Sequence, residues 1–395
     1  MNEYCNIEIQ KLASSAASGR YLLGYNGKFF EANSYVVELI NCLQEYADED
    51  VAISKYIEKR QGKYTKKQVK GFIEKYLYPL VNTDVPQKRK QFLYEKELFS
   101  ASLVDKITPY LVGLFNKWLV CGILIFAVIV DVSYLSQTSN LLDFNKHIDA
   151  YSILGIVMFM LGSSLFHELG HATACRHFGI QHKGIGFGLY LNFPVFYTDV
   201  TEIWKLNRQQ RNVVNLAGVY FQSYCLIGLI TIYMITPSDL IRYLILSMNF
   251  GFLMVLNPFF KFDGYWIASD ILGVPNLRRR AQELYGYIYH RLRGTMGRKP
   301  YLLELKPCAK YTFMVYSILV NLFMGYYFVY IIPSFVYHFV MSFPSEIEKI
   351  VILLSNNMAP PFSLLRNICM QLLFLILILV MIYRIVSPLF SKCKK

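Results

Sequence analysis

Residues 162–179, GSSLFHELGHATACRHFG, close an apolar run that begins near residue 151. This stretch contains the pattern HExxH, formed by His167, Glu168 and His171. The apolar run before it is long enough to cross a bilayer as a helix. Residues four apart share one face of a helix, so both imidazoles can reach a single metal ion. The stretch therefore predicts a membrane helix with a metal site at its end.

The chemistry of such a site depends on the glutamate. Glu168 lies beside the two imidazoles and can accept a proton from a metal-bound water. Zinc lowers the pKa of bound water from 15.7 to about 7, which makes hydroxide available at neutral pH. Ionisable side chains are costly inside a membrane span and usually serve a function there. A Zn²⁺ site is therefore favoured over a chance match to the pattern.

A catalytic zinc site needs a third protein ligand and one open position. His177 falls at the last position of the longer pattern HExxHxxGxxH, but Ala174 stands where that pattern has glycine. A helix that continues through Ala174 would carry His177 past the metal. Asp263, in LNPFFKFDGYW, follows a later apolar run, where Pro258 breaks the helix and Gly264 permits a tight turn. We expect Asp263 to be the third ligand and His177 to be an ordinary loop or interface residue.

The composition is that of a membrane protein. The chain has 395 residues, of which 54% are hydrophobic, compared with about 45–50% in a soluble domain. Its formal charge of +13 could indicate nucleic-acid binding. However, the basic residues flank the apolar runs and no nucleic-acid motif accompanies them, so we expect the lipid bilayer as a partner and no nucleic acid. The eight cysteines include no CxxC pair, which argues against a disulfide scaffold and a thiolate zinc cluster.

Six apolar runs are predicted to span the membrane. They cover roughly residues 114–135, 151–171, 213–235, 240–258, 312–336 and 364–386. Lys and Arg gather before the first run, after the second, after the fourth and in the tail, and cytoplasmic loops carry such an excess. We therefore predict a multi-pass protein of the cell membrane with both termini in the cytoplasm. The amphipathic stretch 337–359 is expected to lie on the membrane surface.

Residues 1–85 are polar and are predicted to form a separate cytosolic domain. Asn26-Gly27 lies between two apolar-rich stretches, which is typical of a β-hairpin turn. Two later stretches have apolar residues at helical spacing, and Thr65 is placed to cap the second of them. A hairpin followed by about three helices predicts a small α+β, winged-helix-like domain.

The expected fold class is thus a mainly α membrane protein with about six transmembrane helices, preceded by that domain. Residues 86–113 are expected to be a basic linker, and residues 114–395 the membrane metalloprotease domain. Residues 179–200 alternate apolar and small side chains, which predicts a small β insertion between spans two and three. The edge of such a sheet near the zinc could accept an extended peptide by strand addition. Asp199, in this insertion, is either a residue that orients a ligand imidazole or a plain loop carboxylate.

Two segments together resemble a known family. HELGH in one span and NPFFKFDG at a later one resemble the site-2 protease family of intramembrane zinc metalloproteases. The stretches PVFYTDVTEIWKLNRQQRNVVNLAG and LNPFFKFDGYWIASDILGVPNLRRRA resemble its peptide zinc metalloprotease branch, which is linked to processing or export of ribosomally made modified peptides. The similarity is strong over roughly residues 150–285 and weak in the flanking spans.

This resemblance implies roles for particular residues. It implies that His167, His171 and Asp263 bind zinc and that Glu168 is the base. It also implies that Asn257 hydrogen-bonds the substrate backbone or the transition state, whereas a cap for the end of the span is the alternative role. Phe262 stands where the familiar form of the motif has leucine, which puts the substrate geometry in doubt.

The N-terminal pattern of a hairpin and helices resembles the PqqD-like domains that recognise leader peptides, and a generic winged-helix module is the alternative. The function predicted from the sequence is that of an intramembrane zinc metalloendopeptidase. Its substrate would be a peptide precursor, with a leader peptide bound by the N-terminal domain, or a membrane-anchored protein. The alternatives are a non-catalytic membrane binding or transport component that retains the protease fold, and a zinc-dependent sensor. The intact Glu168 disfavours a component that has lost catalysis.

Overall fold

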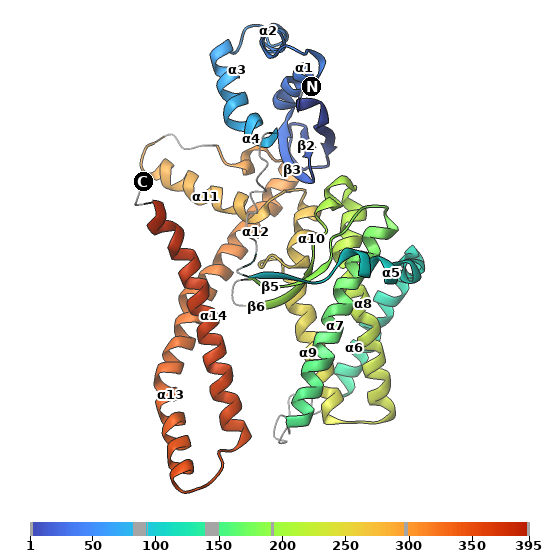
Figure 1. Cartoon of the computed structure of the whole chain (residues 1–395), viewed down its shortest axis with the longest axis vertical. Helices are drawn as coiled ribbons and strands as arrows, with labels where there is room; N and C mark the ends of the chain where they lie inside the picture. Colours follow the sequence, from blue (N-terminus) through green and yellow to red (C-terminus); the bar gives the residue numbers. More distant parts are fainter. Residues whose placement is uncertain are drawn as a thin grey trace. The chain divides into compact units, whose positions relative to one another are not determined.

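The computed structural model describes residues 3–81, 92, 94–138, 150–190, 193–295 and 299–392, and these are mainly helical (Figure 1). The chain forms two compact units. The first, here called the N-terminal unit, consists of Met1–Arg89, Thr201–Asn212 and Ile267–Ile318. The second, here called the membrane unit, consists of Lys90–Val200, Val213–Trp266 and Leu319–Lys395.

The N-terminal unit contains a three-stranded antiparallel sheet. Its strands, in the order β1-β2-β3, are β1 (Glu8–Leu12), β2 (Arg20–Tyr25) and β3 (Lys28–Asn33). The predicted hairpin is confirmed, since Tyr25 pairs with Lys28 across Asn26 and Gly27. Both turn residues have positive φ, 47° and 70°, as a type I′ turn requires. The first strand, β1, was not expected from the sequence.

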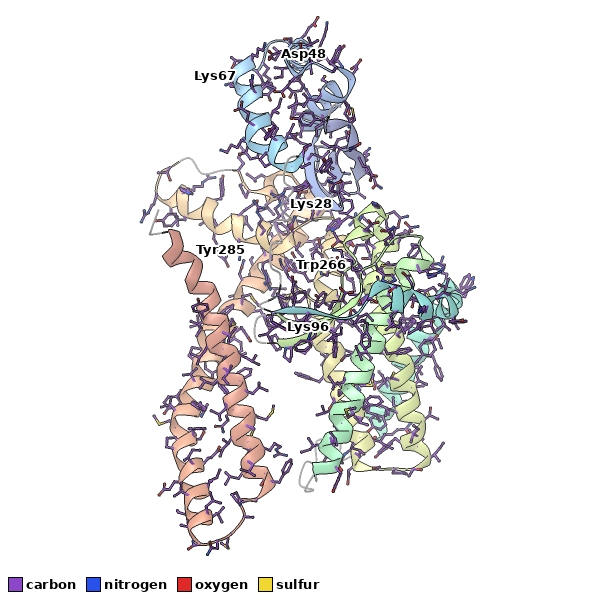
Figure 2. All side chains as sticks on the ribbon, in the orientation of Figure 1. Lys28, Asp48, Lys67, Lys96, Trp266 and Tyr285 are labelled. Atoms are coloured by element: carbon purple, nitrogen blue, oxygen red, sulfur yellow. The ribbon has the colours of Figure 1, made fainter. Side chains whose placement is uncertain are left out.

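Helices follow the sheet, as predicted. They are α1 (Ser34–Glu45), α2 (Glu49–Lys59), α3 (Lys66–Phe72), a π-helical turn (Ile73–Leu77) and α4 (Tyr78–Val81), and Figure 2 labels Asp48 and Lys67 at the starts of α2 and α3. The predicted Thr65 cap is confirmed and forms a capping box with Gln68. Ile40, Leu43 and Ile53 are fully buried in the core below these helices. The result is a small α+β domain, and its winged-helix arrangement stays a prediction.

Later segments of the chain complete this unit. They include a 3₁₀ turn (Thr201–Lys205), the end of α10 (Asp263–Leu272), α11 (Leu277–Leu292), which carries the labelled Tyr285 of Figure 2, and a second 3₁₀ turn (Tyr301–Glu304). Ala16 and Leu305 form an antiparallel bridge, and the Ala17 N–H donates to the Glu304 carbonyl at 2.7 Å. The N-terminal domain is therefore joined to these segments by backbone hydrogen bonds as well as by side chains.

Five helical segments in the described part of the chain are long and apolar enough to cross a membrane. They are Lys117–Gln137 (α6), Tyr151–His177 of α7 (Ala150–His177), Arg208–Ile235 (α8), Pro307–Ser355 and Phe362–Tyr383 of α14 (Phe362–Lys392). Helix α9 (Asp239–Val255), which corresponds to the predicted fourth span, has only 17 residues. A membrane protein is thus confirmed, whereas the count of six spans stays a prediction.

The segment Pro307–Ser355 is a single helical run of 49 residues. It consists of α12 (Pro307–Tyr326), a π-helical turn (Tyr327–Ile331) and α13 (Ile332–Ser355). At 1.5 Å per residue it is about 74 Å long, more than twice the roughly 30 Å of a bilayer core. The residues of the expected surface stretch, up to Ser355, therefore continue the preceding helix and do not start a helix of their own.

The helices α6, α7, α8 and α9 pack together in the membrane unit. Tyr134, Ile230 and Ile245 lie at the centre of this packing and are almost fully buried. A polar contact also joins α6 to α9, because the Asn249 side-chain amide donates to Asp131 Oδ1 at 2.9 Å. This bundle supplies most of the scaffold for the site described below.

The predicted β insertion is confirmed. The strands β5 (Ile185–Tyr190) and β6 (Phe193–Thr198) form an antiparallel hairpin. A third strand, β4 (Glu95–Phe99), pairs with β5, so the order is β4-β5-β6, and Lys96 marks β4 in Figure 2. Strand β4 and the helix α5 (Ala101–Leu111) come from the expected linker, of which residues 86–91 and 93 lie outside the described residues.

Candidate metal centre

Three predicted ligands meet at one point in the membrane unit. His167 and His171 lie one turn apart on α7, and Asp263 is the first residue of α10. The two Nε2 atoms are 3.1 Å apart. Asp263 Oδ2 is 3.1 Å from His167 Nε2 and 3.2 Å from His171 Nε2. The three atoms therefore form a nearly equilateral triangle.

This triangle has the dimensions of a zinc site. Donor atoms bonded at about 2.0–2.1 Å in a tetrahedron stand about 3.3–3.4 Å apart. Asp263 Oδ2 is buried and lacks a hydrogen-bond donor among the described residues, as expected of an oxygen that binds a cation. Two imidazole nitrogens and one carboxylate oxygen are ligands that zinc commonly takes, so the donor set fits this ion.

Glu168 is placed beside the triangle. It follows His167 on α7, it is 7% exposed, and it offers a carboxylate oxygen within 4.8 Å of the ligating nitrogens of both histidines. Its backbone carbonyl accepts a hydrogen bond from Thr198 Oγ1 at 3.2 Å, which joins the end of β6 to the helix. The geometry is compatible with the predicted role of Glu168 as a base.

Helix α8 orients both imidazoles. His171 Nδ1 lies 2.8 Å from the Val214 carbonyl, which can only accept, so Nδ1 carries the proton and Nε2 is free to bind a metal. His167 Nδ1 lies 3.1 Å from Gln222 Oε1, and Gln222 Nε2 in turn donates to Ser163 Oγ at 3.1 Å. The sequence reasoning missed both partners. A backbone carbonyl has no sequence signature, whereas Gln222 is detectable as a lone amide in the apolar stretch YFQSYCLIGLI.

Glycines allow the close approach of these elements. A Cβ on Gly218 would lie less than 3.0 Å from three ring atoms of His167, and a Cβ on Gly170 would lie as close to the Ala217 carbonyl. A Cβ on Gly264 would collide with the backbone of Leu256. The imidazole of His167, the Ala217 carbonyl and the Leu256 backbone therefore occupy space that the Cβ of any other residue at these positions would fill.

The remaining predicted site residues have other contacts. Asn257 Oδ1 accepts from the Phe259 N–H at 2.8 Å, within the turn that follows α9, and both its substrate role and the capping alternative stay predictions. The Asp199 carboxylate pairs with Lys183, and the Lys183 N–H donates to the Asp199 carbonyl at 3.0 Å. The role of Asp199 at an imidazole likewise stays a prediction. The His177 ring packs 5.9 Å from the Phe115 ring, as suits a structural residue.

Sequence comparison finds a relative with a metalloprotease name. The chain is 29% identical over 129 residues to the protein named "Putative peptide zinc metalloprotease protein YydH" of Bacillus subtilis (strain 168). The matched region is 31% of this chain and spans about half the length of that protein. No family model matches the chain. No solved structure matches it either. This distant, partial similarity gives weak support for a zinc metalloprotease.

Proposed function

We propose that this chain is an intramembrane zinc endopeptidase of the site-2 protease type. The single observation that carries the proposal is the triangle of His167 Nε2, His171 Nε2 and Asp263 Oδ2 with the Glu168 carboxylate beside it. The name of the Bacillus subtilis relative supports the same chemistry. The substrate is a peptide precursor or a membrane-anchored protein, cleaved in the processing or export of a ribosomally made modified peptide.

His167, His171 and Asp263 would hold the ion. A bound zinc ion would polarise the scissile carbonyl and acidify the attacking water. Glu168 takes the proton of that water and later donates it to the leaving amine. The hydrogen bonds of Gln222 and Val214 keep both imidazoles in the tautomer that presents Nε2 to the centre.

Hydrolysis at membrane depth requires a path for water. A cleft of about 580 Å³ lies beside the break that ends α9. Its lining includes the polar groups of Asp131, Asn249 and Asn257, together with Pro258 and Phe259. We propose that water reaches the site from this cleft, because irregular backbone at membrane depth is tolerated where it lines a hydrated cavity.

Strand β6 suits an extended substrate. Among the described strands it pairs only with β5, so its other edge is free for strand addition. Its last residue, Thr198, touches the backbone of Glu168. A peptide added to this edge would be extended, so its scissile bond would not be protected by helical hydrogen bonds. The proposed leader peptide would bind the N-terminal domain by the same kind of strand addition, as in the PqqD-like domains it resembles.

The decisive test separates chemistry from binding. We expect Glu168→Gln to keep about one zinc per chain but to lower turnover by about 10²–10⁴-fold or more, because glutamine cannot accept the proton. His167→Ala should lose both the turnover and the zinc, because it removes a ligand. Zinc analysis and cleavage of fluorogenic model peptides by the reconstituted protein measure both effects. Turnover near the wild-type rate in Glu168→Gln would rule out hydrolysis by this site and favour the binding or transport function for it.

A further inference from the structure

Helix α10 has its first residue in the metal site and its last turn in the N-terminal unit. It begins at Asp263 and ends at Leu272. A short α-helix is stiff, and the seven steps from Asp263 to Asp270 rise only about 10 Å at 1.5 Å per residue. Contacts that hold the end of this helix therefore also set the direction in which Asp263 points.

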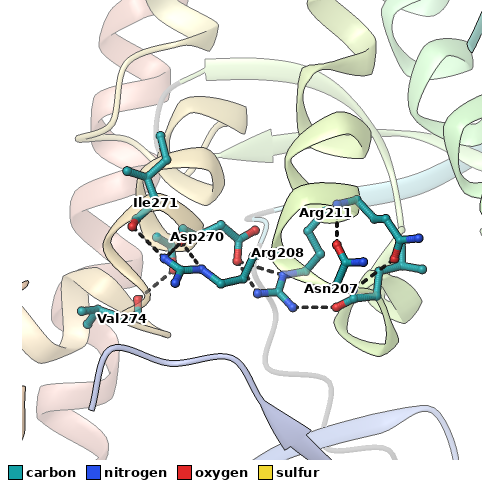
Figure 3. A network of polar contacts seen from close by, with 9 residues as sticks. Asn207, Arg208, Arg211, Asp270, Ile271 and Val274 are labelled. Carbon is teal, nitrogen blue, oxygen red and sulfur yellow. Dashed lines mark hydrogen bonds and ion pairs between the residues drawn. The ribbon is translucent and has the colours of Figure 1, made fainter. Parts of the chain in front are cut away.

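A buried ion pair holds the last turn. Arg211, near the start of α8, donates from Nε and Nη2 to Asp270 Oδ1 at 2.8 and 2.6 Å (Figure 3). The two side chains are only 4% and 8% exposed. A third donor of the guanidinium, Nη1, binds the Leu206 carbonyl at 2.9 Å. Separating the two side chains would leave each of them as an uncompensated buried charge, so this contact is costly to break. Arg211 is also three residues before Val214, the partner of His171.

Arg208 binds the carbonyl end of the same helix. Its Nε donates to the Asp270 carbonyl at 2.7 Å and its Nη2 to the Ile271 carbonyl at 2.7 Å (Figure 3). The last carbonyls of a helix have no partner within the helix and carry partial negative charge. The guanidinium of Arg208 therefore caps α10 and neutralises its C-terminal end.

The N-terminal domain supplies the remaining contact. Ser15, in the loop between β1 and β2, donates from its N–H to the Gly273 carbonyl at 2.9 Å. The Ser15 carbonyl accepts from the Lys306 N–H at 3.1 Å, which fixes this loop on both sides. Gly273 has a φ of +64°, and a Cβ there would lie less than 3.0 Å from Ser15 Oγ. The loop is therefore seated directly on the turn that ends α10.

We propose that Ser15, Arg208 and Arg211 form a clamp on the end of α10 that positions Asp263 for zinc. The proposal rests on the proposed function, because it requires that zinc binds His167, His171 and Asp263. Ser15, Arg208 and Arg211 act on Asp263 through the helix. They are therefore positioning residues and not catalytic ones.

A pair of glycine variants tests the contribution of the loop. Gly273→Ala adds a Cβ that collides with Ser15, whereas Gly62→Ala adds one at a similar φ, +70°, with nothing within 4 Å. The backbone strain is thus matched, and only the first variant displaces the loop. We expect Gly273→Ala to weaken zinc binding about 10–100-fold, the usual effect of a lost supporting contact, and Gly62→Ala to bind like the wild type. Adding Ser15→Ala to Gly273→Ala removes Oγ and should restore part of the affinity.

A second pair tests the buried ion pair. Asp270→Asn breaks the contact with Arg211, and Glu31→Gln breaks the part-buried pair with Arg280, at 2.9 Å, in the same unit but away from α10. Both variants should lower the unfolding temperature. Only Asp270→Asn should weaken zinc binding, by about 10–100-fold, and change the visible absorption of the cobalt-substituted protein.

Chelator competition on the full-length protein in detergent gives the zinc affinity in each case. If the wild type binds zinc and both members of each pair bind it equally well, the clamp is refuted and the proposed function survives. If the wild type binds no zinc at all, the proposed function itself fails. If both members of a pair lose zinc equally, general destabilisation explains the loss and the clamp is again refuted.

Discussion

Gly218 constrains the position of His167, the first of the proposed zinc ligands. Helix α8 passes the ring of His167 so closely that the ring occupies the space where a side chain at residue 218 would stand. Gln222, one turn later on the same helix, binds Nδ1 of that ring at 3.1 Å. A missing side chain and a hydrogen bond thus fix the imidazole from two directions, and both belong to the helix that also binds His171 through Val214.

We therefore expect Gly218→Ala to displace His167 and to weaken zinc binding about 10–100-fold, measured by chelator competition. Gly228→Ala is the matched control, because it lies in the same helix and a Cβ there meets nothing within 4 Å. The control should bind zinc at the wild-type level and gain slightly in helix stability. Equal zinc affinity in the two variants would show that the close approach does not constrain the ligand.

The sequence predicts the parts of this site that depend on local spacing. His167, Glu168 and His171 follow from one turn of helix, and Asp263 follows from a helix break at a matched depth. Val214 and Gly218 could not be predicted, because they contribute a carbonyl and an empty space. Their roles depend on which residues of α8 pack opposite which residues of α7. A single sequence carries no signal for that register.

At the scale of elements, the contact between Asp131 and Asn249 joins two apolar helices by one hydrogen bond. Such bonds inside membranes contribute about 0.6–2 kcal/mol. Asp131→Ala removes the acceptor, so we expect it to lower the unfolding temperature in detergent. Asp131→Asn keeps an acceptor oxygen and should stay close to the wild type. If the two variants unfold at the same temperature, the hydrogen bond does not stabilise the packing of α6 on α9.

The strands that were missed lack a turn signal of their own. The hairpin of β2 and β3 carries its own signal, Asn26-Gly27, whereas β1 and β4 become strands through pairing with β2 and β5. The span predicted to end near residue 336 instead continues as a helix to Ser355, and Pro344 lies inside it. Proline inside a membrane helix is tolerated because neighbouring groups satisfy the freed carbonyl, and the sequence does not reveal those neighbours.

For the whole molecule, the compact units group the chain differently from a linear series of domains. The sequence predicts a boundary near residue 85, but Thr201–Asn212 and Ile267–Ile318 fold with the N-terminal domain. The contacts responsible are a backbone bridge at Ala16 and ion pairs such as that of Glu31 with Arg280. These contacts join residues more than 240 positions apart, so local patterns cannot predict them.

The number of spans decides the side on which each terminus lies. Six spans place both termini on the same side of the membrane, whereas five spans place them on opposite sides. The difference rests on α9, whose 17 residues make a helix of about 26 Å, slightly shorter than the roughly 30 Å of the bilayer core. A bilayer can thin locally or a helix can oligomerise to accommodate such a mismatch, so α9 remains long enough to span.

Cysteine labelling in intact cells distinguishes the two arrangements. Variants that keep only Cys5 or only Cys393, the latter outside the described residues, report the two termini. From the alternation of basic loops we expect both to be protected from an impermeant thiol reagent, and a cysteine in place of Ser139, also outside the described residues, to be labelled. Permeabilised cells are the control and should label all three. If Cys5 is protected but Cys393 is labelled from outside, the number of spans is odd and α9 does not cross the membrane.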